Sequence, residues 1–392
     1  MDVSYFLECF SLPSTHPESI HPCLLNACYL GACVIGGGSM ASFQPLFVER
    51  TRYFLSQALM FADRISHFLW ASIVLSWYFT RLRRLEEAST VISPGAHLAT
   101  ACGLGQLDGF KANAPSGDSL WPPPRNEQEA TDRKKLSYSF YIVDQVFSLI
   151  SGYRATFSGN LDWGSAIELA RLQRQLARDV KTAKCGTLSL WHSGEHLVAA
   201  VLKILQEVRD FALTVCETGK CTDKRAYGLL RDHICSYITL IPPLHEARSL
   251  QPWETFGVFN SATLFAHITL YGCGLILNSL QAGVDVEAGH QVLGCTRALL
   301  DVLSKIRQLR RLHGVRAGLI PVVHVTNAAR IIAHRLQSSK TRANMKLCTE
   351  YCQDLEILLD YVDETYSLYP AWAEAPIRLR EEILVRLSSL AR

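Results

Sequence analysis

An excess of charge of either sign is almost absent from this chain of 392 residues, which has 39 lysines and arginines against 36 aspartates and glutamates. The formal net charge of +3 is too small to indicate a nucleic acid, an acidic membrane surface or a polyanionic substrate by charge alone. Asn-x-Ser/Thr glycosylation sites are also missing. The 13 cysteines are odd in number, scattered and set in apolar contexts, so we expect reduced core thiols in an intracellular protein.

Targeting and membrane-spanning segments are not indicated. No basic residue precedes an apolar run at the N-terminus, which argues against a secretory signal or transit peptide. Two apolar stretches, residues 68–79 and 262–280, are interpreted as core helices. The first is shorter than the ~20 residues of a spanning helix, and the second contains His267 and has no flanking basic anchors. We therefore expect no membrane partner.

The common catalytic signatures are missing as well. No Gly-x-x-x-x-Gly-Lys-Ser/Thr, Gly-x-Ser-x-Gly, His-Glu-x-x-His or Asp-Asp-x-x-Asp pattern occurs. Gly36-Gly37-Gly38-Ser39-Met40-Ala41 matches a dinucleotide loop, but it follows a predicted helix rather than a strand, so we interpret it as a loop that ends the helix. Cys348 and Cys352 share a helix face without a second pair at zinc-site spacing. The prediction is a protein that is not an enzyme and has no catalytic, cofactor-binding or metal residues.

One alternative stays open. His192-Ser193-Gly194-Glu195-His196 matches the His-x-x-Glu-His pattern, in which two imidazoles one helical turn apart hold zinc and the glutamate activates water. Ser193 and Gly194 favour a helix start near residue 195, which would leave His192 outside the helix. The main interpretation is a helix cap, and the alternative is a zinc-dependent hydrolase using His192, Glu195 and His196.

What the sequence does contain is helical periodicity. Hydrophobic residues make up 48% of the chain, its mean hydropathy is +0.10, and apolar residues recur at helical spacing with almost no period-2 alternation. We predict an all-α fold of packed antiparallel helices without significant sheet. Asn126, with Glu129 three residues later, predicts a helix that Gly152 ends, and Ser93-Pro94 predicts a kink or a break. The predicted helices are 22–35, 45–62, 64–82, 84–102, 127–151, 165–184, 195–216, 224–240, 257–282, 286–313, 321–337, 345–367 and 376–390.

Charge is segregated near the C-terminus. Residues 303–346 contain ten basic residues and no acid, whereas residues 347–364 contain six acids and no base. This pattern permits a nucleic-acid footprint. The simpler interpretation is that neighbouring antiparallel helices offset each other's charge. The ten basic residues are Lys305, Arg307, Arg310, Arg311, Arg316, Arg330, Arg335, Lys340, Arg342 and Lys346.

Several stretches in the first 160 residues have the order and spacing of a known family. They are His21-Pro22-Cys23-Leu24-Leu25-Asn26-Ala27 with Leu30-Gly31-Ala32; Phe54-Leu55-Ser56-Gln57-Ala58; Leu75-Ser76-Trp77-Tyr78-Phe79 with Leu85-Glu86; Ala96-His97-Leu98-Ala99-Thr100-Ala101-Cys102-Gly103-Leu104; Pro122-Pro123-Pro124-Arg125; and Asp132-Arg133-Lys134-Lys135-Leu136 with Tyr141-Ile142-Val143-Asp144-Gln145. Together they resemble the fungal-specific transcription factor domain, the middle homology region of zinc binuclear-cluster regulators, in a version similar to basidiomycete members.

The resemblance implies an N-terminal segment (1–19), a regulatory core (20–160) that includes a Pro/Gly-rich connector (103–126), and a C-terminal helical part of the same region (161–392). The implied function is control of DNA-templated transcription in the nucleus. The family's zinc cluster, with its six closely spaced cysteines, is not found in this chain, so no cofactor is expected and DNA would be reached only through a missing or separate module. The resemblance also permits three other partners: a second copy of the chain in a homodimer, a small-molecule effector and a transcriptional co-regulator. A further alternative for the function is a helical interaction scaffold without a transcriptional role.

Overall fold

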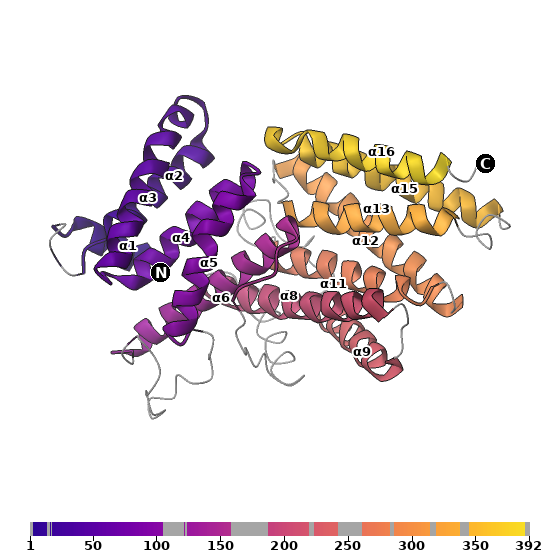
Figure 1. The fold of residues 1–392 in the computed structure, drawn as a ribbon, viewed down its shortest axis with the longest axis horizontal. Coiled ribbons are helices and arrows are strands. Elements are labelled where there is room, and N and C mark those ends of the chain that lie inside the picture. The colour runs from indigo at the N-terminus through magenta and orange to yellow at the C-terminus, as the bar shows by residue number, and fades with distance from the viewer. Residues whose placement is uncertain are drawn as a thin grey trace. The chain divides into compact units, whose positions relative to one another are not determined.

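The described part of the chain is entirely helical. The computed structural model describes residues 3–13, 16, 18–104, 121, 124–157, 187–218, 223–241, 261–282, 286–313, 319–337 and 345–388. These residues form 13 α-helices, two short 3-10 helices and no strand (Figure 1). The all-α prediction is confirmed. The predicted helix at 165–184 and most of the predicted connector lie outside the described residues.

The chain divides into two units, Met1–Trp163 and Gly164–Arg392. In unit 1 the helix α4 is central, because it packs against α2, α3, α5 and α6 (Figure 1). Residues 68–79, one of the two apolar stretches, belong to this helix. The elements of unit 1 are α1 (Val3–Ser11), α2 (Pro22–Gly36), η1 (Gly38–Phe43), α3 (Gln44–Met60), α4 (Ile65–Arg81), α5 (Leu85–Ala101) and α6 (Glu127–Ser151).

Local capping explains where α6 begins and ends. The Asn126 side chain accepts a hydrogen bond from the Glu129 backbone N–H at 2.8 Å, and Gly152 ends the helix at φ 77°. The Glu129 carboxylate accepts from the backbone N–H of Arg125, one residue before the N-cap, at 2.8 Å. Two of the N–H groups around the helix start are thereby satisfied, as the sequence predicts.

Helix α5 continues through Pro94, so the break predicted as one outcome is wrong, and the kink stays a prediction. A proline inside a helix removes one N–H donor. Here the neighbouring Gly95 allows close packing, since a Cβ at this position would lie 2.8 Å from Cζ of the buried Phe140 on α6. The packing of α5 against α4 and α6 compensates for the missing hydrogen bond and keeps the helix in one piece.

Unit 2 is arranged around α11, which packs against α8, α9, α12 and α13. Residues Ala262–Ser279 of α11 are long and apolar enough to cross a membrane, but 72% of this window is buried inside the protein. A core helix has this pattern. The elements of unit 2 are α8 (Thr187–Thr218), α9 (Lys224–Leu240), α11 (Ser261–Ser279), α12 (Val286–His313), α13 (Leu319–Gln337), α15 (Met345–Tyr366), η4 (Pro370–Trp372) and α16 (Glu374–Ser388).

A buried histidine lies where α13 crosses α11. His324 is 0% exposed, and neither ring nitrogen has a hydrogen-bond partner among the described residues. The ring fits because residue 272 of α11 is a glycine, where a Cβ would lie only 2.3 Å from Nδ1 of His324. Burial lowers the pKa of His324 to about 4, with a smaller contribution from the positive charge of Arg209. The interior of unit 2 therefore keeps this ring neutral.

The contact between Gly95 and Phe140 yields a prediction for unit 1. Gly95→Ala should destabilise the protein by about 1–3 kcal/mol, since Phe140 must shift inside a packed core. The matched change Gly31→Ala, in α2, meets no atom within 4 Å and should stabilise by about 0.5–1 kcal/mol through helix propensity. Urea unfolding followed by circular dichroism measures both, and equal effects of the two substitutions would contradict the packing argument.

The buried histidines predict acid sensitivity. Burial also lowers the pKa of His67 in unit 1 to about 4, against 6.5 for an exposed histidine. Because the pKa of each histidine is lower in the folded state than in the unfolded state, its contribution to the free energy of unfolding is fully present above about pH 6.5. That contribution is lost as the pH falls toward 4, by about 3 kcal/mol at most for each histidine. His324→Leu should therefore make the fall in melting temperature between pH 6.5 and 4.5 shallower.

The control is His290→Gln, at an exposed position of α12. It should leave the pH dependence of the melting temperature as in the parent protein. An unchanged slope for His324→Leu would show that His324 is not kept neutral by the fold.

Candidate functional site

The His192-Glu195-His196 pattern lies inside a helix. Because α8 begins at Thr187, the expectation that the helix starts near residue 195 and leaves His192 outside is wrong. The backbone places residues 192 and 196 one turn apart, as a zinc site requires. The side chains of residues 187–196 lie outside the described part, so their contacts do not enter the argument. The zinc alternative stays a prediction.

Three of the basic residues in the run pair with an acid on the same or a neighbouring helix. Arg307 of α12 pairs with Glu364 of α15 at 3.0 Å, and Arg330 of α13 pairs with Glu382 of α16 at 3.0 Å. Lys305 pairs with Asp301 within α12 at 2.5 Å. These contacts support charge compensation between antiparallel helices over a nucleic-acid footprint. The side chains of Arg310, Arg311, Arg316, Lys340 and Arg342 lie outside the described residues.

In unit 1 the residues that carry the family resemblance join helices. His21 caps α2, its Nδ1 accepting from the Cys23 backbone N–H at 3.1 Å, and its own backbone N–H donates to Nδ1 of His67 on α4 at 3.2 Å. Arg64, with φ 46° at the start of α4, donates to the carbonyl oxygen of Ser19 at 2.9 Å and to both carboxylate oxygens of Asp63. This polar cluster attaches the segment before α2 to α4, which is a structural role.

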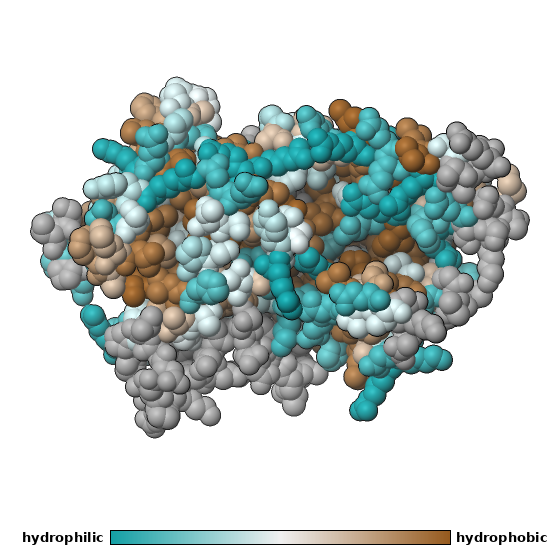
Figure 2. Space-filling model, viewed as in Figure 1, coloured by the Kyte–Doolittle hydropathy of each residue, from teal (hydrophilic) through white to brown (hydrophobic). Residues whose placement is uncertain are grey.

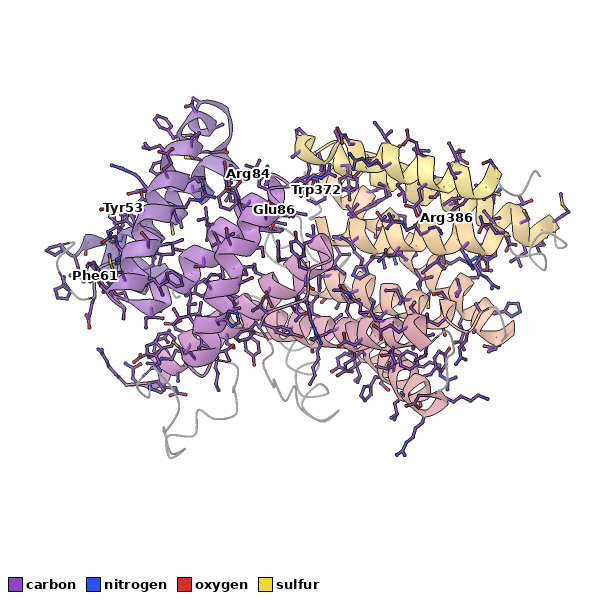
Figure 3. All side chains as sticks on the ribbon, in the orientation of Figure 1. Tyr53, Phe61, Arg84, Glu86, Trp372 and Arg386 are labelled. Atoms are coloured by element: carbon purple, nitrogen blue, oxygen red, sulfur yellow. The ribbon has the colours of Figure 1, made fainter. Side chains whose placement is uncertain are left out.

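A second group of side chains, around Phe79 of the family stretches, connects α3 with α5. The guanidinium groups of Arg52 and Arg84 lie 4.6 and 4.9 Å from the ring centroid of the buried Phe79, and both pair with Glu87. Arg84 and Glu86, labelled in Figure 3, lie at the start of α5. The carboxylate that pairs with both arginines therefore belongs to Glu87, the residue after Glu86 of the Leu85-Glu86 stretch.

Asp144 of α6 has a perturbed pKa and two backbone hydrogen-bond partners. Burial raises the pKa of its carboxyl group to about 6, against the opposing effect of backbone N–H bonds. Its Oδ2 accepts from the backbone N–H groups of Thr156 at 2.9 Å and Phe157 at 2.8 Å. A shifted carboxyl can mark a catalytic group. Here it fixes the chain after α6 against that helix.

Unit 1 also exposes large apolar side chains along α3. Leu46, Tyr53 and Met60 follow one another at intervals of seven residues, and Phe61 at the end of the helix is 69% exposed. Figure 3 shows Tyr53 and Phe61 projecting from α3, and Figure 2 shows hydrophobic side chains at the surface among hydrophilic ones. Surfaces of this composition are typical of contacts with another protein.

A concave site among the described residues lies in unit 2, where α11, α13 and α16 approach their C-terminal ends. A pocket of about 490 Å³ is lined by Ser279 of α11, by Ile331 and Gln337 of α13, and by basic side chains. Gln337 Nε2 donates to the backbone carbonyl of Arg386 at 2.7 Å, which ties α13 to α16 at this point. The basic lining residues are Arg330, His334 and Arg335 of α13 and Arg386 of α16; Figure 3 labels Arg386.

One acidic residue fixes the orientation of two of the arginines that line this pocket. Glu382 of α16 accepts from Nε and Nη2 of Arg330 at 3.0 Å each through Oε2, and from Nη2 of Arg386 at 2.9 Å through Oε1. Arg335 instead donates from Nη1 to the Ala282 carbonyl at 2.6 Å, just beyond the end of α11. The lining therefore brings together three guanidinium groups, with one carboxylate bridging two of them.

Sequence reasoning identified part of this site. Arg330 and Arg335 belong to the basic run, but the run contains no sign of a pocket, and Arg386 and Ser279 lie far from it along the chain. Only helix packing brings these segments together.

No metal cluster accompanies these sites. Within the described ranges there is no group of three or more His, Cys, Asp and Glu side chains that could hold a metal ion. That search does not reach the side chains of His192, Glu195 and His196. In comparisons with protein-family models, with curated proteins and with solved structures, nothing matches this chain.

Proposed function

We propose that this chain is the regulatory, non-DNA-reading region of a fungal transcription factor, which controls DNA-templated transcription through the binding of an effector or a partner. The proposal starts from the ordered stretches between His21 and Gln145 and their resemblance to the fungal-specific transcription factor domain. The nucleus is the location that goes with this role, and DNA is reached through a separate module.

The observation that supports it most is the placement of those stretches within one helical unit. A family motif made of helix-packing residues requires its side chains to lie where consecutive helices meet. His21 joins α2 to α4, and Phe79 packs beneath Arg52 and Arg84 of neighbouring elements. Ser137 of α6 donates to the Leu104 carbonyl, just after α5, at 2.5 Å. The resemblance is thus compatible with a scaffold whose helices can shift between two packings to transmit a signal.

A reporter assay tests this role. The full chain, fused to a heterologous DNA-binding module, should raise or lower transcription from the matching promoter relative to the module alone. Gly272→Val should abolish the change, because the added side chain collides with His324 and disrupts unit 2. Neither activation nor repression at equal protein levels would favour a helical interaction scaffold without a transcriptional role.

The second candidate function is a zinc-dependent hydrolase that uses His192, Glu195 and His196. The observation that favours it is the helical backbone of α8 from Thr187 onward, which gives the two histidines the required separation. It also needs a further ligand from another segment.

Metal analysis of the purified full chain separates the two candidates. Under the regulatory proposal the zinc content is well below one ion per chain and is the same in the parent, in His196→Ala and in the control His233→Ala, at an exposed position of α9. One zinc per chain that is lost in His196→Ala but retained in His233→Ala would establish the zinc site instead.

A further inference from the structure

We infer that the pocket between α11, α13 and α16 binds a small organic anion, whose carboxylate or phosphate group contacts Arg330 and Arg386 while its apolar part lies against Ile331. This inference deepens the proposed function by naming the chemical class of an effector. The binding itself is a property of unit 2 that can be measured without any transcriptional readout.

The first argument is charge. Arg330, Arg335 and Arg386 line the pocket, and Glu382 is the acid that pairs with two of them. Basic residues near helix C-termini often offset the partial negative charge of the last carbonyls. Arg335 does this for α11 through Ala282. The guanidinium groups of Arg330 and Arg386 are bonded instead to one carboxylate, Glu382, which both of them share.

The second argument is geometry. Glu382 accepts from both guanidinium groups, so they are oriented side by side before any ligand arrives. Arg330 uses Nε and Nη2 for this contact, and no described residue occupies its Nη1. A planar guanidinium presents donors that match a carboxylate or phosphate in pairs. Preorganised donors reduce the entropy lost on binding.

The third argument is size and exposure. The pocket volume of about 490 Å³ lies within the ~300–1,000 Å³ typical of small-molecule sites. The side chains of Arg330 and Arg386 are 44% and 41% exposed, so an anion reaches them from solvent. Ile331 and the hydrocarbon stems of the arginines supply an apolar wall.

The same features argue against a nucleic acid as the ligand of this pocket. A DNA backbone needs a row of available cations along an extended surface. The neighbouring cations Arg297 and Arg307 are instead paired with Glu350 and Glu364 of α15. What is left is a concave site with a few convergent donors, which suits a single anionic group.

Calorimetric titration of the purified full chain at low ionic strength tests the inference. Hexanoate and hexyl phosphate are the probes, and their relative affinity identifies the preferred head group. At least one should bind saturably with one site per chain, whereas neutral 1-hexanol should not. Inorganic phosphate should bind at least tenfold more weakly than the preferred probe, since it has no apolar part.

Two variants and a matched control locate the site. Arg330→Gln and Arg386→Gln should each weaken the preferred probe by about tenfold, the loss expected for one charge-assisted contact. Arg378→Gln removes an equal charge from the same helix as Arg386, at an exposed pair with Glu374, and should bind like the parent. Both pocket arginines are partly exposed, so the variants should keep the parent melting curve by circular dichroism.

The inference is overturned if neither probe binds, if both pocket variants bind like the parent, or if Arg378→Gln weakens binding equally. The inference would also be overturned if inorganic phosphate bound as tightly as the preferred probe. The same holds if duplex DNA displaced the probe and its binding depended on Arg330 and Arg386. The binding experiment and the reporter assay can fail independently. A protein that binds the anion can lack transcriptional activity, and a protein with transcriptional activity can fail to bind the anion.

Discussion

Burial of one apolar helix at the centre of each unit is the constraint on which the rest of the fold depends. In unit 1 this helix is α4, and in unit 2 it is α11, each of them packed against four others. A helix that is apolar on most of its circumference must be covered on most sides. The two apolar stretches that stand out in the sequence, residues 68–79 and 262–280, belong to these two helices. Neighbouring helices take the place that lipid would have around a membrane span.

Polar residues within this packing serve mainly to join helices. His21, Arg64 and Asp144 resemble functional groups in type and setting, yet their hydrogen bonds end on backbone groups or on neighbours that fix chain segments. His324 differs, because it is buried without a described hydrogen-bond partner and is accommodated by the missing side chain of Gly272. The perturbed pKa values of Asp144 and His324 follow mainly from their burial.

The surface of unit 2 shows how pairing decides what a charged segment can do. Most of the described cations in the basic run contact an acid on the same or a neighbouring helix, so the run has little of the character of a nucleic-acid surface. Where α11, α13 and α16 end near one another, three arginines line a pocket, and two of them, Arg330 and Arg386, share the acid Glu382. This arrangement is the basis of the anion site that we propose.

Sequence alone determined the helices, because periodicity and caps are local properties. Asn126 and Gly152 bound α6 as expected, and the C-terminal helices lie within a few residues of their predicted ranges. The structure differs from the sequence prediction at Pro94, through which α5 continues because it packs against α4 and α6, and at the start of α8, which lies at Thr187. Only the tertiary structure decided which cations are paired and where the pocket lies, because Ser279, Arg330 and Arg386 come from three separate helices. These three residues come together because of how the side chains of the three helices pack against one another. The spacing of residues within any one segment does not determine that packing.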